Sequence, residues 1–144
     1  MMKRIGFFAA MALLCLLATA CPEVEPEEEK LDVTGQWQLN RIETKVQVGD
    51  QTVDVYVAFN GDGTFELFQM LGTGRYRRYT GNWTLNEKRL DGTYTGGASW
   101  ASSYDISMDA NRSQLVMTAT NGGDVLTYRK QTIPEDVRNN ALEP

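Results

Sequence analysis

Few side chains in this chain combine a reactive group with the neighbours that would activate it. Histidine is absent from all 144 residues, which removes the commonest general base and the commonest zinc ligand together. Ser99, Ser102 and Ser103 therefore have no histidine to activate a hydroxyl, and no motif links them to a lysine. The sequence predicts no catalytic residue, no metal site and no cofactor.

Acidic residues are the remaining candidates for chemistry, and their pattern is not that of a known site. The stretch Asn-Gly-Asp-Gly at residues 60–63 lacks the third acidic ligand and the distal glutamate of a calcium loop. Its glycines and asparagine favour a tight hairpin turn instead. No feature singles out a pair of carboxylates for sugar hydrolysis. We therefore predict that the protein is not an enzyme.

The two cysteines of the chain lie within its first 21 residues. Lys3 and Arg4 form a basic start, and an apolar stretch follows at residues 5–17. Small residues at 18–20 then precede Cys21, which completes the pattern of a secretory signal. The apolar stretch is shorter than the roughly 20 residues of a membrane-spanning helix. This junction resembles the signal of a bacterial lipoprotein, which implies that Cys21 is acylated and becomes the first mature residue; an ordinary cleaved signal is the alternative.

An acidic run at residues 23–29 follows the cysteine at once. It resembles the export tag found after the acylated cysteine in surface-exposed lipoproteins of some Gram-negative gut bacteria. The resemblance implies an outer-membrane protein, lipid-anchored and exposed on the cell surface, although a plain tether facing the periplasm would have the same composition. We expect a signal peptide at 1–20, an acidic disordered tether at 21–30 and one folded domain at 31–144.

Charge and cysteine content limit the partners of this domain. The formal net charge is −5 and much of it lies in the acidic run, so the domain itself is only mildly acidic. The arginines of residues 75–79 alternate along a predicted strand and cannot share one face. We therefore expect no nucleic-acid partner. With both cysteines outside the domain, we also expect no disulfide in it.

From residue 31 onward, short runs of β-branched and aromatic residues alternate with glycine, asparagine and aspartate at close spacing, as in antiparallel all-β folds. Proline and acidic residues after residue 132 indicate a short C-terminal helix. The predicted fold is an eight-stranded up-and-down barrel, with a two-sheet sandwich as the alternative. The expected strands are 36–48, 52–59, 64–71, 75–85, 90–95, 103–108, 114–120 and 125–131.

Gly35 and Trp37 open the first predicted strand, and Arg129 lies in the last. This arrangement resembles the lipocalin-type barrel, whose first strand begins Gly-x-Trp. The resemblance covers residues 31–131 and implies that Arg129 stacks on Trp37 to close the barrel base. The helix that lipocalins carry before the last strand is missing from this sequence.

An eight-stranded barrel is either filled by side chains or able to hold one small ligand, and the sequence leaves both possibilities open. A hollow barrel implies a lipid-anchored, monomeric binding protein for a small apolar ligand. A filled barrel implies a protein-interaction module, such as an adhesin, a complex subunit or an enzyme inhibitor. Residues 64–71 carry apolar side chains on both faces, so one face must meet something other than water. The candidate contact residues for a ligand or partner are Trp100, Tyr76, Phe68, Met70, Trp83 and Tyr104.

Overall fold

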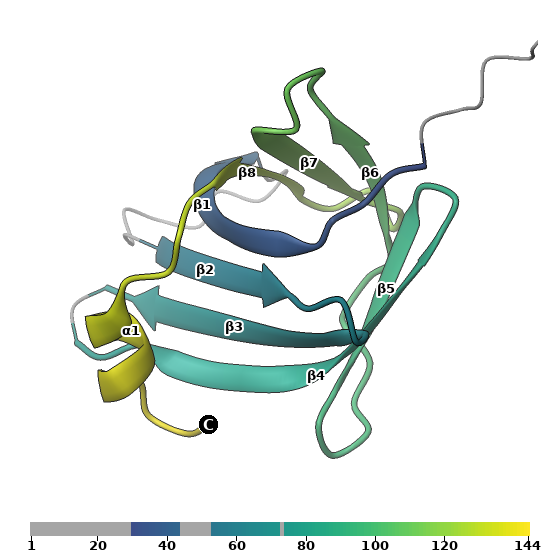
Figure 1. The fold of residues 1–144 in the computed structure, drawn as a ribbon. Helices are drawn as coiled ribbons and strands as arrows, with labels where there is room; N and C mark the ends of the chain where they lie inside the picture. The colour runs from purple at the N-terminus through teal and green to yellow at the C-terminus, as the bar shows by residue number, and fades with distance from the viewer. Residues whose placement is uncertain (1–29, 44–52, 73) are drawn as a thin grey trace, which may run out of the picture.

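A computed structural model describes residues 30–43, 53–72 and 74–144 (Figure 1). They form eight strands and one short helix, and none of the helices in this part is long and apolar enough to cross a membrane. The predicted lipidation site Cys21, the signal at 1–20 and most of the tether lie outside the described residues. The elements are β1 Gly35–Glu43, β2 Val53–Phe59, β3 Thr64–Leu71, β4 Arg77–Asn86, β5 Arg89–Tyr94, β6 Tyr104–Met108, β7 Gln114–Ala119, β8 Val125–Lys130 and α1 Glu135–Asn140.

The strands form one closed barrel in chain order. Each strand pairs antiparallel with its neighbour in sequence, and β1 also pairs with β8, for example through Leu39 and Tyr128. This last pairing closes the barrel, so the predicted up-and-down barrel is confirmed and the two-sheet sandwich is wrong. Among the described residues every strand thus has a neighbour on both sides, although β5 and β6 share only two register pairs.

Most strand boundaries lie within one residue of those expected, and two need comment. β4 begins at Arg77, two residues later than predicted, because the chain around Tyr76 instead receives a hydrogen bond from the backbone of Leu142 at 2.8 Å. β1 is described as far as Glu43, and the rest of the predicted first strand lies outside the described residues.

Tight turns join the strands at one end of the barrel. In the turn at 60–63, the backbone N–H of Asn60 donates to the carbonyl of Thr64 at 2.8 Å, and Gly63 takes the positive φ of 86° that glycine tolerates best. Because strands alternate in direction, the β4–β5 and β6–β7 turns lie at the same end. The chain also enters the barrel here, through residues 30–34 (Figure 1).

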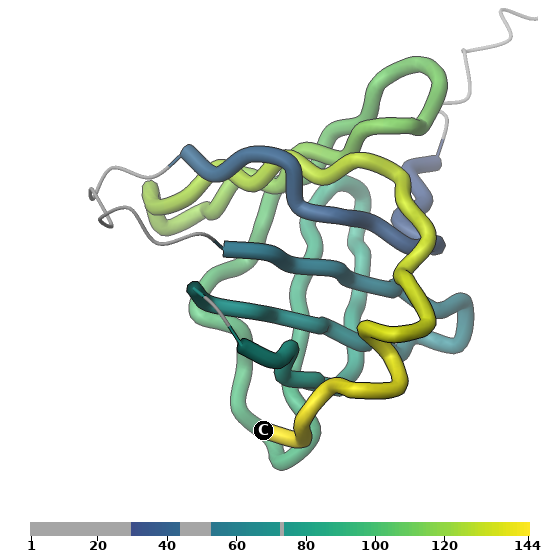
Figure 2. The backbone as a smooth tube through the Cα atoms, turned by 90° about the vertical axis from the view of Figure 1, so that its left-hand side faces the viewer, coloured from purple at the N-terminus to yellow at the C-terminus, as the bar shows by residue number. Residues whose placement is uncertain are grey.

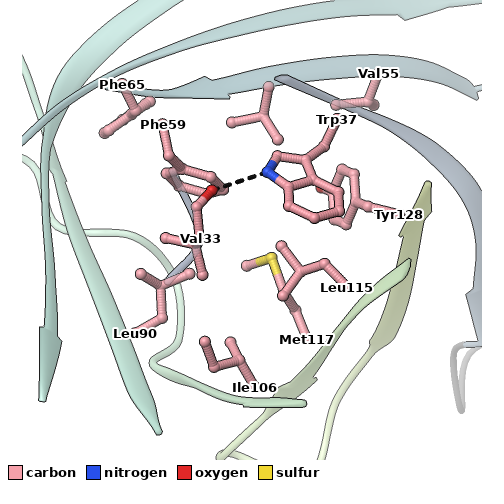
Figure 3. Close-up of a cluster of buried hydrophobic side chains, with 11 residues drawn as sticks. Val33, Trp37, Val55, Phe59, Phe65, Leu90, Ile106, Leu115, Met117 and Tyr128 are labelled. Carbon is pink, nitrogen blue, oxygen red and sulfur yellow. Dashed lines mark hydrogen bonds between the residues drawn. The ribbon is translucent and has the colours of Figure 1, made fainter. Parts of the chain in front are cut away.

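This end is plugged by a dense apolar cluster centred on Trp37, whose side chain is 1 % exposed (Figure 3). The indole N–H of Trp37 donates to the carbonyl of Val33 at 2.9 Å, which ties the entering chain across the barrel base. Val33, Leu90 and Leu115 are fully buried around it. Such packing satisfies the one polar atom of the indole while removing its large apolar area from water.

The cation over Trp37 is Lys130, and the prediction that Arg129 occupies this place is wrong. The Nζ atom of Lys130 lies 5.8 Å from the centre of the indole ring. Trp37 and Lys130 face each other across the β1–β8 pair, whereas Arg129 is the partner of Gln38. Neighbouring residues of a strand point to opposite faces, so Arg129 lies outside the barrel, where it donates to Oε1 of Gln38 at 2.6 Å.

A second apolar cluster covers the outer face of β2 and β3. After β8 the chain runs down the outside of these strands and forms α1 there (Figures 1 and 2). Ile133 and Val137 pack on Phe68, which is 1 % exposed. The guanidinium of Arg138 lies 5.6 Å from the Phe68 ring centre and within 3.5 Å of the carboxylate of Glu66. The C-terminal segment is therefore what covers the outward apolar face of β3.

Candidate functional site

The barrel is hollow at the end opposite Trp37, where a cavity of about 300 Å³ lies. Every strand except β4 contributes to its wall. The lining residues are Leu39, Ile42, Val53, Val55, Val57, Phe59, Phe65, Leu67, Gln69, Tyr94, Trp100, Ala101, Tyr104, Met117, Asp124, Leu126 and Tyr128. We call this cavity the cup, and its open end the mouth.

The aliphatic wall of the cup follows directly from the period of two in the strands. Residues 53, 55, 57 and 59 of β2 all point inward, and residues 65, 67 and 69 of β3 stand opposite them in register. At the mouth, this wall ends in Leu71, which is 57 % exposed, and Ile42, which is 38 % exposed. The cup thus has an apolar side and an apolar rim.

Trp100 forms the opposite wall, although it lies in the loop between β5 and β6. Those two strands have only two register pairs, Arg89 with Asp105 and Leu90 with Tyr104, and they separate beyond them. The indole of Trp100 lies beside Gly92, the residue of β5 where a Cβ atom would come within 2.0 Å of Cε2 of Trp100. Gly92 therefore leaves the space that lets a loop tryptophan line the barrel.

The backbone holds this tryptophan in place as well. The N–H of Trp100 donates to the carbonyl of Gly92 at 2.9 Å, and Ser99 forms a β-bridge with Thr93. Inside the cup, the indole meets the ring of Phe65 edge to face at 5.2 Å and that of Tyr104 at 6.1 Å between centres. The ring is thus an ordered part of the wall.

Polar groups of the cup come mainly from three tyrosines, Tyr94, Tyr104 and Tyr128. Burial raises the pKa of all three phenols, and the nearby carboxylate of Asp124 raises that of Tyr104 further. The phenols are therefore neutral at physiological pH. Within the described residues, none of the three hydroxyls has a protein hydrogen-bond partner.

The structure brings together two of the six predicted contact residues, Trp100 and Tyr104, and places the other four elsewhere. Phe68 is buried beneath α1. Tyr76 also packs against that cluster, and its hydroxyl donates to the carboxylate of Asp54 on the outer face of β2. Phe68 is buried and Tyr76 is half-buried, and both are packed in the cluster that the C-terminal segment covers.

Trp83 and Met70 lie outside the cup as well. The indole N–H of Trp83 donates to the carbonyl of Thr64 at 2.9 Å, and its ring meets Phe59 edge to face at 5.8 Å. Trp83 therefore supports the wall from beside the closed end. Met70 pairs in register with Asp54 and shares its outward face.

Four polar residues of the lining were not among the six predicted contact residues: Gln69, Tyr94, Asp124 and Tyr128. The sequence pattern could have indicated Gln69 and Tyr128, because each continues a series of alternate, inward-pointing residues along its strand. Asp124 belongs to the loop after β7, which has no such period. Across residues 30–43, 53–72 and 74–144, no three acidic, cysteine or histidine side chains gather where they could hold a metal ion.

Comparison with known proteins adds one positive result. Residues 33–117, more than half of the chain, match the family model described as a lipocalin-like domain. A search of the curated proteins found no match.

Proposed function

The chain belongs to the lipocalin-like domain family, and from this premise we propose that its cup binds one small, largely apolar molecule. The observation that carries the proposal is the cavity of about 300 Å³ inside a closed barrel. Small-molecule sites are concave and mostly apolar with a few placed polar groups, and roughly 300 Å³ is the lower end of their usual volume. The ligand is therefore small.

The wall and the floor of the cup support this use. Aliphatic residues from β1, β2 and β8 form one side, and the Trp37 cluster seals the base. An apolar ligand entering such a space releases its hydration and meets a preformed surface, so little ordering free energy opposes binding.

The alternative function, a protein-interaction module with a filled barrel, has less support. It requires exposed aromatic anchors, and Tyr76 and Phe68 are instead packed against the C-terminal segment. It also requires an interior without space for a ligand.

The place of this cup in the cell is part of the same proposal. The lipoprotein-type junction at Cys21 supports attachment to the outer membrane, and the acidic run at 23–29 supports display on the cell surface. The protein would then act there as a monomeric binding protein without catalysis.

The binding function is tested by asking what the protein carries. We expect the protein, purified from its own envelope, to release a small molecule on organic extraction, detected by mass spectrometry. Leu126→Trp places a large side chain in the cup, so no such molecule should be recovered from this variant. Thr127→Trp is the matched control, because the neighbouring residue lies on the outer face, opposite Val116. Equal recovery from both variants, with both folded, would contradict a ligand in the cup.

A further inference from the structure

The exposed carboxylate of Asp124 at the mouth and the aromatic rings that line the cup point to the chemical class of the ligand, given the binding function proposed above. Asp124 is the one charged residue in the lining. Its side chain has no hydrogen bond or ion pair with any described residue. No lysine or arginine of the described residues lines the cavity. An anionic ligand would therefore lose hydration and meet a carboxylate, which disfavours it.

Aromatic rings gather on the same side of the cup as Asp124. Trp100 contacts Tyr104 and Phe65, and Phe65 contacts Tyr94 with ring centres 5.8 Å apart. Ring faces attract a cation through their quadrupole, most strongly for tryptophan and tyrosine and where water is excluded. Unpartnered phenol oxygens can also accept hydrogen bonds from an ammonium group.

We propose that the cup takes a small organic cation, an ammonium group on an apolar body. The ammonium would lie among Tyr94, Trp100 and Tyr104, next to Asp124, and the apolar body would lie along the aliphatic wall of β1, β2 and β8. This placement uses the carboxylate of Asp124 and the phenols of Tyr94 and Tyr104, which have no hydrogen-bond partner among the described residues.

Arg77 is a cationic residue close to the mouth. Arg77 is the register partner of Gln69 at the mouth, and it is exposed and outside the lining. If the ligand were an anion with its head group at the mouth, this arginine would be the residue to hold it.

The test uses three probes with the same eight-carbon chain: octylammonium, octanol and octanoate. Their dissociation constants are measured by calorimetry on the mature chain from residue 21 with Cys21→Ala, which lacks the acyl chains. We expect the ammonium to bind at least about tenfold more tightly than octanoate, a difference of roughly 1.4 kcal/mol. Octanol should lie between them.

Variants then assign the preference to residues. Asp124→Asn should raise the dissociation constant of the ammonium about tenfold and leave that of octanol unchanged. Glu135→Gln, which removes one negative charge from the exposed start of α1, should change neither. Arg77→Gln should have no effect on the ammonium.

The outcomes separate the two proposals. Binding of octanol and octanoate as tight as that of the ammonium, or loss of octanoate binding in Arg77→Gln, would overturn the cation assignment and leave the binding function standing. Failure of all three probes, together with no extracted molecule from the native protein, would overturn the binding function itself.

Discussion

Gly92 and Trp100 form the residue pair on which the shape of the cup depends. Gly92 has no positive φ, so its role is to leave space. Because the indole occupies the position of a missing Cβ atom, one added methyl group on the strand would push the tryptophan into the cavity or out of the barrel.

The first prediction follows from this contact. Gly92→Ala should lower the free energy of unfolding by about 2 kcal/mol, as overpacking in a filled site does, and should shift the tryptophan fluorescence. Denaturant unfolding measures the first change and emission spectra the second.

A second variant shows whether the indole of Trp100 causes this loss of stability. In Trp100→Ala the space beside Gly92 is empty, so adding Gly92→Ala there should cost much less than in the native chain. Gly61→Ala is the matched control, since a Cβ atom at Gly61 meets nothing within 4 Å. Equal losses in the two backgrounds would show that the cost comes from the strand backbone.

At the scale of elements, the C-terminal segment acts as an outer layer that the barrel needs. Its helix has only six residues, too few to be stable alone. It is held by the apolar contact of Val137 and Ile133 with Phe68, and by the backbone of Leu142, which accepts a hydrogen bond from Arg78 at 2.8 Å.

The second prediction tests this layer. Val137→Ala removes two buried methyl groups from the contact with Phe68 and should cost about 2 kcal/mol of stability. Asn139→Ala, at an exposed position of the same helix, should change it by less than about 0.5 kcal/mol. Thermal unfolding of the two variants compares them. A Val137→Ala melting temperature equal to that of the native protein would show that α1 adds nothing to barrel stability.

These elements also show how far the sequence could predict the fold. The strands were predictable because β-branched and aromatic residues alternate between turns rich in glycine and asparagine. The barrel was predictable only as one of two alternatives, because closure depends on the pairing of β1 with β8, which are far apart in the chain. Which segment covers the outward apolar face of β3 could not be predicted, because no pattern in the sequence pairs a six-residue helix with a particular strand.

The prediction at the barrel base chose Arg129 where the structure has Lys130, because it assigned the wrong face to neighbouring residues of β8. Tyr128 points inward, so Lys130, two residues on, does too, and Arg129 between them cannot. A prediction that had assigned the face of Tyr128 first would have chosen Lys130. The position of Trp100 could not be found in this way, because a loop residue has no register, and only its packing beside Gly92 shows where it lies.

At the scale of the whole molecule, attachment to the membrane through Cys21 and display on the cell surface are tested separately. We expect the native chain to incorporate a labelled fatty acid and to fractionate with the outer membrane. Cys21→Ala should abolish the label, because it removes the thiol that carries the acyl chain. Labelling that persists in this variant would contradict acylation at Cys21.

The acidic run is tested in the same cells. Glu27, Glu28 and Glu29 replaced together by alanine should leave the label in place but protect the protein from protease added to intact cells. Native protein that resists the protease until lysis would face the periplasm, and an unchanged cleavage pattern in the variant would make the run a plain tether.

The chain enters the barrel through residues 30–34, at the end that Trp37 seals. A stretch from residue 21 to residue 30 can reach roughly 30 Å at most. An acylated Cys21 would therefore keep the sealed base within about this distance of the bilayer, and the mouth, at the opposite end of the barrel, could face the surrounding fluid. In that orientation, solutes would reach the barrel by diffusion through this fluid, and lipids of the membrane that holds the anchor would have no direct route into it.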